Sequence, residues 1–358
     1  MKKVLMVASA ASHFENFHIP YIKHFHDRGV QVYTASAGKL HSDYVYKHLE
    51  LAFRKKLYHP SNIGVIFRLA RLMRRERFDI VYTNSSLAGF TGRMALKLSG
   101  RRKTKAVHIC HGYLFNDDGS KHSKLYLAFE KLVRRRTDLL AVMNRDDFEI
   151  ANKYSLGKKT VFINGMGMDA SRFARINGTT MQEQRRRLGA SEKTVIFLCV
   201  GEFSPRKSQE CIIEACSLLK DKNYLMVFAG EGELLEKCKN LAEKLGVDDK
   251  TLFLGHRSDT NELYRSCDCL ISASRIEGLP FNVMEALYCG MDIAVSDVKG
   301  NRDLAQRFGG VTFPYGDAGA LAAVMQDMSR SEHICQYQDG NFLLKDVFEE
   351  NLTLLEML

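Results

Sequence analysis

Two series of short apolar segments, each followed by a stretch with helical spacing, constrain the fold of this chain most strongly. The first series is VLMVASA, QVYTAS, IVYTN, AVHIC, LLAVMN and VFIN, and the second is TVIFLCV, LMVFAG, TLFLG, CLISAS, DIAVSD and GVTF. Strands that are apolar on both faces and alternate with helices are typical of parallel sheets covered by helices on both sides. The sequence therefore predicts an α/β protein with two doubly wound, Rossmann-like domains.

The break between the two series is a polar stretch without strand character, which contains INGTT and QEQRRR. We therefore assign residues 1–168 to a first domain, 169–193 to a linker and 194–335 to a second domain. Residues 336–358 are predicted to end the chain as an amphipathic helix, with an apolar side formed by Phe342, Leu343, Val347, Phe348, Leu352 and Leu355. This helix could pack on either domain, and so could cross back to the first.

The composition is that of an ordinary globular protein, with 45% hydrophobic and 26% charged residues. No run of about 18 apolar residues occurs, so no segment is predicted to span a bilayer. The start, MKKVLMVASA, is followed at once by the polar SHFEN, which favours a first strand over a signal peptide. None of the nine cysteines forms a C-x-x-C pair, which favours buried thiols in a reducing, cytoplasmic compartment over a zinc ribbon or redox site.

Charge is divided unevenly along the chain. Residues 1–165 contain 30 lysines and arginines against 13 acidic residues, a formal charge of +17, and the rest of the chain carries −7. Nearly half of these basic residues form short clusters: Arg54-Lys55-Lys56, Arg68 to Phe78, Arg101-Arg102-Lys103 and Arg134-Arg135-Arg136. Such asymmetry predicts that the first domain faces an anionic surface.

The predicted helix from Asn62 to Arg77 mixes apolar and basic residues, as a helix at a membrane interface does. We therefore predict that the first domain docks on the inner face of the cell membrane as a peripheral protein. The alternative for this helix is a core-packed helix with a solvated basic face. A nucleic acid partner is not predicted, because no aromatic and basic base-reading pattern accompanies the charge.

The segment EGLPFNVMEAL places Glu277 and Glu285 around the start of a predicted helix. Pro280 suits the first helical turn, and a helix start attracts phosphate through its backbone amides and its positive dipole end. Two carboxylates in this place could accept hydrogen bonds from sugar and ribose hydroxyls. The alternative is a loop acid followed by a solvated helix acid.

The segment GEFSPRKSQ puts Arg206 and Lys207 at the start of another predicted helix. Cations at a helix N-terminus oppose the helix dipole, so they do not stabilise the helix itself. A diphosphate held between these cations and the backbone amides would explain them. The alternative is a solvated basic turn.

Together these segments resemble the donor domain of the family 4 retaining glycosyltransferases, which have the GT-B fold. The resemblance rests on VGEFSPRKSQ, FAGEGE, FLGHRSD, the Glu277-x₇-Glu285 pair and GNRDL in the second half. In the first half it rests on HFENFHIPYIKHF, HICHGYLFND and LLAVMNRDDFEIANKY running into INGMGMDASRF. It extends from about Val4 to Gln326 and is closest to the branch that builds capsule and exopolysaccharide repeats on a lipid carrier.

The resemblance implies two domains facing each other across a cleft and a role for each site residue. Lys207 would neutralise the donor diphosphate, with Arg206 beside it, and Glu285 would hold the ribose. Glu277 and the backbone at Gly278, Leu279, Pro280 and Phe281 would contact the transferred sugar and the distal phosphate. His111 would lie beside the sugar, although without the family a lone histidine after a strand is more often structural. The catalytic residues implied are therefore His111, Lys207 and Glu277.

The chain departs from the family pattern at two places. Glu202 stands where many members have arginine, so Arg206 or Arg257 would have to supply the missing phosphate cation. Ala10-Ala11-Ser12-His13 stands where many members have a glycine-rich loop after the first strand.

The partners implied are a nucleotide diphosphate sugar, expected to be a UDP-sugar, and a lipid-linked saccharide acceptor. No cofactor is expected. No Asp-x-Asp is present to hold a metal at the diphosphate, so we expect metal-independent transfer, and the P-loop pattern of NTPases is missing.

Three other functions remain open on the sequence alone. Gly165-Met-Gly167-Met-Asp-Ala170 fits the dinucleotide pattern G-x-G-x-x-A of an NAD-dependent oxidoreductase, but the residues that follow it have no helical periodicity. Gly230-Glu-Gly232 precedes a helix, but its flanking glutamates would oppose a pyrophosphate. A nucleotide-sugar epimerase of similar shape and a non-catalytic binding module are the other two.

Overall fold

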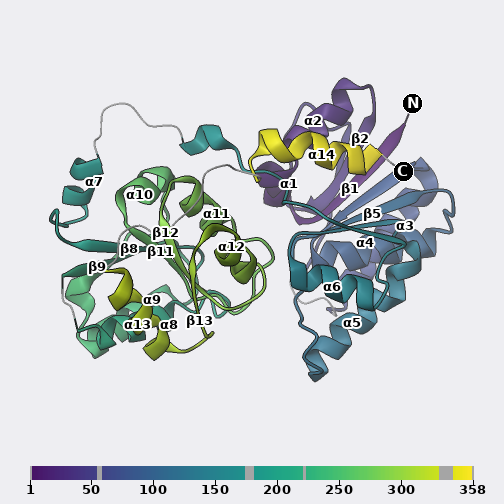
Figure 1. Ribbon diagram of the computed structural model, residues 1–358. Coiled ribbons are helices and arrows are strands. Elements are labelled where there is room, and N and C mark those ends of the chain that lie inside the picture. Colours follow the sequence, from purple (N-terminus) through teal and green to yellow (C-terminus); the bar gives the residue numbers. More distant parts are fainter. Residues whose placement is uncertain (1, 55–58, 174–180, 221–222, 330–341, 357–358) are drawn as a thin grey trace. The chain divides into compact units, whose positions relative to one another are not determined.

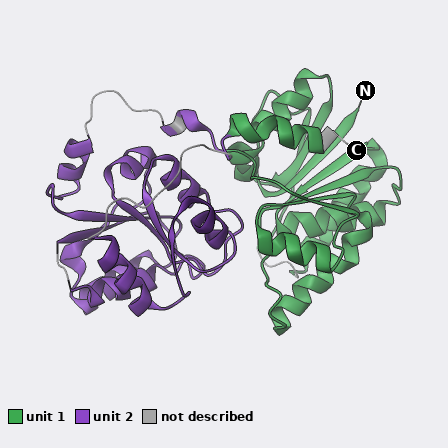
Figure 2. Cartoon of the chain, in the orientation of Figure 1, with its two compact units in different colours: residues 1–167, 344–358 green, residues 168–343 purple. Residues whose placement is uncertain are grey.

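The computed structural model describes residues 2–54, 59–173, 181–220, 223–329 and 342–356 (Figure 1). Two compact units make up the chain, unit 1 (Met1–Gly167 with Leu344–Leu358) and unit 2 (Met168–Leu343) (Figure 2). Each unit has its own sheet and its own buried core. The prediction of two doubly wound α/β domains is therefore confirmed.

Unit 1 contains, within the described ranges, a seven-stranded parallel sheet in the order β3-β2-β1-β4-β5-β6-β7. The strands are β1 Lys3–Ala10, β2 Gln31–Ala37, β3 Lys47–Glu50, β4 Ile80–Asn84, β5 Lys105–Cys110, β6 Leu139–Val142 and β7 Lys159–Phe162. The helices are α1 Ala11–Phe17, α2 Ile19–Asp27, α3 Ser61–Glu76, α4 Ser86–Ser99, α5 Lys121–Val133, the short 3₁₀ helix Arg134–Arg136, α6 Arg145–Lys153 and α14 Leu344–Glu356.

Unit 2 contains a six-stranded parallel sheet, counted over its described residues, in the order β10-β9-β8-β11-β12-β13. The strands are β8 Val195–Val200, β9 Tyr224–Ala229, β10 Thr251–Phe253, β11 Cys269–Ser272, β12 Asp292–Ser296 and β13 Val311–Phe313. The helices are the 3₁₀ helix Ala170–Phe173, α7 Met181–Arg187, α8 Gln209–Leu218, α9 Leu235–Leu245, the 3₁₀ helix Asp248–Lys250, α10 Thr260–Ser266, α11 Phe281–Tyr288, α12 Asn301–Phe308 and α13 Ala318–Met328.

The strand order reverses once in each sheet, between β1 and β4 in unit 1 and between β8 and β11 in unit 2. At such a point the connections from two adjacent strands leave in opposite directions and open a crevice at the carboxyl edge of the sheet. The loops after β8 and β11 are therefore where a ligand site is expected in unit 2. In unit 1 the same edge carries the segments that follow β1, β4 and β5.

The sequence predicted a linker at residues 169–193. The structure places this segment in unit 2 instead. Its helix α7 packs against α10, and Arg185 donates hydrogen bonds to the Asp268 carboxylate at 2.8 and 3.0 Å. The three consecutive arginines concealed this, because one of them is a packed residue and not a solvated one. INGTT, at residues 176–180, lies outside the described residues.

The C-terminal helix α14 belongs to unit 1, as the sequence allowed. It begins at Leu344, so Phe342 and Leu343, which were expected on its apolar side, lie before the helix and are buried in the core of unit 2. Buried Asn351 donates hydrogen bonds to Tyr21 Oη and to the carbonyl of Gly165, both at 2.9 Å, and Phe348 packs against the ring of Tyr21. Residues 336–341 lie outside the described residues, and so does the side chain of Leu355.

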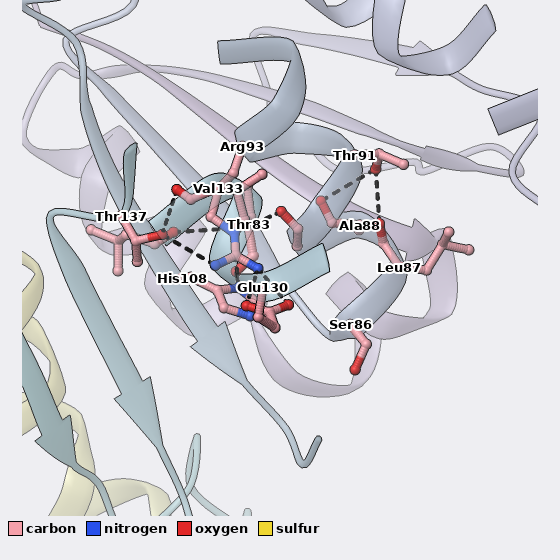
Figure 3. Close-up of polar contacts among 12 residues, drawn as sticks. Thr83, Ser86, Leu87, Ala88, Thr91, Arg93, His108, Glu130, Val133 and Thr137 are labelled. Atoms are coloured by element: carbon pink, nitrogen blue, oxygen red, sulfur yellow. Dashed lines mark hydrogen bonds and ion pairs between the residues drawn. The ribbon is translucent and has the colours of Figure 1, made fainter. Parts of the chain in front are cut away.

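A buried ion pair ties α4 to α5 inside unit 1 (Figure 3). Arg93 is fully buried, and its Nη2 lies 2.9 Å from both carboxylate oxygens of Glu130. Arg93 also donates to the carbonyl of Gly89 and to Thr137 Oγ1. Glycine is required at position 89, because a Cβ there would come within 2.3 Å of the buried ring of His108.

Among the described residues, none of the helices is long and apolar enough to cross a membrane.

Candidate active site

The loops that follow β8 and β11 meet at the point where the strand order of unit 2 reverses. The backbone N–H of Arg275 donates to the carbonyl of Arg206 at 2.8 Å, which joins the two loops directly. Asn282, in the first turn of α11, donates from Nδ2 to the carbonyl of Val200 at the end of β8. The two loops are therefore held together by one backbone hydrogen bond and by the Asn282 side chain.

An ion cluster lies across this junction. Arg206 Nη1 and Lys207 Nζ each lie 2.7 Å from the same oxygen, Oε1 of Glu277. The side chains of Lys207 and Glu277 are 12% and 9% exposed, whereas that of Arg206 is 40% exposed. Gly201 makes room for the stem of Lys207, because a Cβ there would lie 3.3 Å from Lys207 Cε. The structure thus brings together three residues that the sequence placed in two separate motifs.

The cluster carries two cations and one carboxylate. Burial by itself would raise the pKa of Glu277, but the charges of Lys207 and Arg206 outweigh it and hold this pKa below its ordinary value. A hydrogen bond from Ser274 acts in the same direction. Glu277 is therefore ionised at neutral pH, and the cluster has a net charge of +1, which favours an anionic ligand.

Arg206 and Lys207 were predicted at the start of a helix. In the structure they lie just before α8 and not in its first turn. Helix α8 begins at Gln209, and Arg206 and Lys207 lie in the turn that precedes it. Gln209 donates from Nε2 to the carbonyl of Glu202 at 2.9 Å, which fixes this turn, while the Glu202 side chain is exposed. Arg206 and Lys207 therefore lie in a fixed turn just before α8.

Glu285 lies inside α11, where its Oε2 accepts a 2.8 Å hydrogen bond from Tyr264 Oη. Tyr264 comes from α10 and is fully buried, so its hydroxyl can orient the carboxylate from below. Tyr264 is a site residue that the sequence did not predict, since the spacing of residues along two helices does not show which side chains face each other. The acidic pair is thus held by different partners, Glu277 by cations and Glu285 by a phenol.

The segment Gly278 to Phe281 leads into α11, and the loop after β12 packs directly against it. Gly300 has a φ of +77°, and a Cβ at this position would come within 2.4 Å of the carbonyl of Gly278. Asn301 donates to Ser296 Oγ, and Ser296 donates to the carbonyl of Ser274 at 2.5 Å. The GNRDL motif therefore supports the Glu277 loop from behind.

Arg257 is not joined to this cluster by any contact within the described part of unit 2. Its guanidinium is paired with the carboxylate of Asp259, two residues further along the chain. This pairing raises the pKa of Arg257. Of the two candidates for the missing phosphate cation, Arg206 is the one that contacts Glu277.

His111 follows β5 in unit 1, where it meets two other histidines. The ring centroids of His111 and His13 are 4.5 Å apart, and those of His111 and His18 are 6.0 Å apart. Burial holds the pKa of all three well below the ordinary histidine value, that of His13 at about 4, so the rings are neutral at pH 7. β1 runs directly into α1 at Ala11, which places His13 in that helix.

The two glycine segments that fit a dinucleotide pattern are filled by protein. A Cβ on Gly167 would come within 2.5 Å of Leu344, and one on Gly232 within 2.3 Å of the carbonyl of Phe203. Among the described residues, the first helix after Gly167 is the short 3₁₀ helix Ala170–Phe173, and not an α-helix. These glycines permit close packing of the chain on itself, which removes the structural basis for the oxidoreductase alternative.

Comparison with protein families gives a match over most of the chain. Residues 180–340 match the family described as glycosyl transferases group 1, and residues 20–169 match the family described as glycosyltransferase family 4. The division between the two matches falls near the division between the two units.

Curated relatives are glycosyltransferases. The glycosyltransferase EpsD of Bacillus subtilis is 30% identical over 340 residues, which cover 94% of this chain and 89% of that protein. The UDP-Gal:alpha-D-GlcNAc-diphosphoundecaprenol alpha-1,3-galactosyltransferase of Escherichia coli is 29% identical over 249 residues, which cover 67% of this chain and 63% of that protein.

Solved structures share the fold at low sequence identity. HepE of Anabaena, in complex with UDP and glucose, has a TM-score of 0.78 and 15% identity over all of both chains. WaaG, a glycosyltransferase involved in lipopolysaccharide biosynthesis, has a TM-score of 0.72 and 17% identity, with 99% of this chain and all of that one covered.

Proposed function

The chain belongs to the family 4 glycosyltransferases, and on that premise we propose that it transfers a sugar, with retention, from a UDP-sugar to a lipid-linked glycan. The donor class is supported by the E. coli relative, whose name specifies UDP-Gal, and by the UDP in the HepE complex. The acceptor class is supported by the same relative, whose name specifies a diphosphoundecaprenol-linked sugar. The product would then enter surface polysaccharide.

The ion cluster of Arg206, Lys207 and Glu277 is the observation that carries the proposal. When the bond between the anomeric carbon and the distal phosphate oxygen breaks, negative charge grows on the leaving diphosphate. Two cations already fixed at this place stabilise that charge without having to reorganise, which is an efficient form of electrostatic catalysis. We therefore assign the diphosphate to Arg206, Lys207 and the backbone from Gly278 to Phe281, and no metal ion is needed there.

Retention requires the acceptor hydroxyl to attack from the side on which the diphosphate leaves. The new bond forms between the acceptor oxygen and the anomeric carbon, and the hydroxyl proton passes to an oxygen of the departing phosphate. In this assignment Glu277 serves twice, since it holds the two cations in place and offers its second oxygen to a hydroxyl of the transferred sugar. Glu285, oriented by Tyr264, would accept hydrogen bonds from the ribose.

His111 of unit 1 is assigned to the transferred sugar. Its Nε2 is buried and finds no hydrogen-bond partner among the described residues, so it can serve a ligand. A neutral imidazole can donate or accept one hydrogen bond from that atom, according to its tautomer.

Unit 1 is proposed to dock on an anionic membrane surface through α3. The core of the unit buries Ile66, Leu69, Ala70 and Met73, so these apolar residues do not face a membrane. Ile63 and Phe67 remain, 56% and 62% exposed, one helical turn apart. Exposed Arg68 and Arg71 lie beside them, and such a pairing of apolar and basic groups on one helix face suits an anionic leaflet.

A thermal-shift screen against UDP-, GDP-, ADP- and dTDP-sugars tests the donor assignment. A ligand that binds only the folded state adds about 2.7 kcal/mol at 100 times its dissociation constant, so a true donor raises the melting temperature. We expect a UDP-sugar to do so, and we expect Lys207→Ala to abolish most of the shift. If none of the nucleotide sugars stabilises the protein, the assignment fails.

A further inference from the structure

Three histidines from different parts of unit 1 converge at the carboxyl edge of its sheet. His13 lies in α1 directly after β1, His18 lies between α1 and α2, and His111 follows β5. One ring nitrogen from each of the three lies within 4.8 Å of the other two. Strands β1 and β5 flank β4 in the sheet, so parallel topology brings their carboxyl ends close together.

The hydrogen-bonding capacity of the three imidazole rings is not fully used. The Nε2 atoms of His13, His18 and His111 are all buried, and none has a hydrogen-bond partner within the described residues. A buried polar nitrogen without a partner costs free energy, and three in one place need an explanation. The rings contact each other edge-on or at a tilt and are not stacked, with centroids 4.5, 5.1 and 6.0 Å apart.

We propose that His13, His18 and His111 form a binding site for a transition-metal dication of the zinc class. Imidazole nitrogens suit Zn²⁺, Co²⁺, Ni²⁺ and Cu²⁺, whereas Mg²⁺ and Ca²⁺ select oxygen ligands. Three histidines with a fourth position open to solvent or ligand is an established coordination for zinc. All three histidines belong to unit 1, whereas Arg206, Lys207 and Glu277 belong to unit 2.

The geometry is close to what such an ion requires. A point at the centre of a triangle with sides of 4.8 Å lies roughly 2.8 Å from each corner, and zinc binds histidine nitrogen at about 2.0–2.1 Å. Each nitrogen therefore has to move inward by no more than about 0.8 Å, which a small rotation of each ring supplies.

Occupation of this site has a consequence that rests on the function proposed above. His111 is assigned to the transferred sugar, and an ion bound to its ring would remove that nitrogen from the sugar. Zinc should therefore inhibit transfer, and a chelator should restore it. Metal-free transfer and a metal site in unit 1 are compatible, because the ion would be an inhibitor and not part of the reaction.

The test is titration of the tag-free, metal-stripped protein with Zn²⁺ by calorimetry and with Co²⁺ by visible absorption. We expect one equivalent of each ion to bind, and the cobalt complex to show the intense bands of a tetrahedral site. Variants His13→Gln and His18→Asn should each weaken binding at least about tenfold, since even loss of a group that only supports a ligand costs 10–100-fold. His41→Gln, at an exposed position in the same unit, is the control and should bind normally.

Two results would overturn the proposal. One is the absence of saturable Zn²⁺ binding to the wild-type protein, and the other is binding that His13→Gln leaves unchanged. His13 is only half-buried, so its variant is expected to fold even if the variant of fully buried His18 does not. Because these readouts do not involve catalysis, failure of the metal site and failure of the transferase assignment can be told apart.

Discussion

Lys207 Nζ lies 2.7 Å from Glu277 Oε1, although 70 residues separate the two in the chain. The loops that carry them follow β8 and β11, which pair with each other in the middle of the sheet. Arg206 reaches the same oxygen, so a single carboxylate fixes two cations at the strand-order reversal of unit 2. Glu277 thus holds the two cations together at the place that we propose for the diphosphate.

Removal of the Lys207 charge should lower turnover. Loss of about 1.4 kcal/mol of transition-state stabilisation is one decade in rate, so we expect Lys207→Ala to reduce kcat at least about tenfold. Steady-state kinetics measures this, with the melting temperature as a check on folding. Lys239→Ala, in an exposed pair with Glu236 on α9, is the matched control and should leave kcat unchanged. Equal turnover in the two variants would remove Lys207 from the site.

The hydrogen bond from Tyr264 to Glu285 should matter for donor affinity. A hydrogen bond to a charged group is worth about 1.5–3 kcal/mol, so Glu285→Gln should weaken donor binding by that amount in calorimetry. Tyr264→Phe keeps the ring but removes the hydroxyl that orients Glu285, and should produce a smaller loss in the same direction. Unchanged affinity in Glu285→Gln would mean that the ribose binds elsewhere.

The buried pair of Arg93 and Glu130 should be a large determinant of stability in unit 1. Glu130→Ala leaves a fully buried guanidinium without its carboxylate, which typically costs about 3–5 kcal/mol of unfolding free energy. Glu236→Ala breaks an exposed ion pair on α9 and should cost less than about 1 kcal/mol. Denaturant unfolding compares the two, and similar midpoints would contradict the role given to the buried pair.

Binding of unit 1 to lipid should depend on both charge and the two exposed apolar side chains. In cosedimentation with anionic vesicles, Ile63→Ser with Phe67→Ser should reduce binding, and Arg68→Ser with Arg71→Ser should do so most strongly at low salt. Each basic residue near an anionic leaflet is worth about 1 kcal/mol, an attraction that salt screens. Arg186→Ser with Arg187→Ser, on exposed positions of α7 in unit 2, is the control. Equal partitioning to neutral and anionic vesicles would rule out this surface.

The sheets could be predicted because their strands are apolar throughout, and burial on both faces is visible in the sequence. All twelve expected strands occur. Among the described residues the structure adds a strand that was not predicted, β3 Lys47–Glu50. Its polar residues give no apolar signal, since an edge strand is held by backbone pairing, here with β2. The helical period also could not separate the apolar residues of α3 that enter the core from Ile63 and Phe67, which stay exposed.

Residues of the candidate site could be predicted where they belong to a motif that follows a strand. Glu277 and Arg206 with Lys207 each follow a strand, and parallel strands bring their loops to one edge. Tyr264, His13 and His18 could not be predicted in the same way. Each contacts a side chain from another helix or strand, and the spacing of residues along the chain does not show such contacts. The sequence also contained a sign against Arg257 as a phosphate cation, because Asp259 lies only two residues away and pairs with it.

The most direct test is a transfer assay with a UDP-sugar and a polyprenyl diphosphate-linked saccharide, run in EDTA. We expect the mass of the acceptor to rise by one sugar, UDP to be released in equal amount, and the new linkage to keep the anomeric configuration of the donor. Addition of magnesium or manganese should not increase the rate. Transfer that stops in EDTA and returns with either ion, or a product of inverted configuration, would contradict the mechanism proposed for Arg206, Lys207 and Glu277.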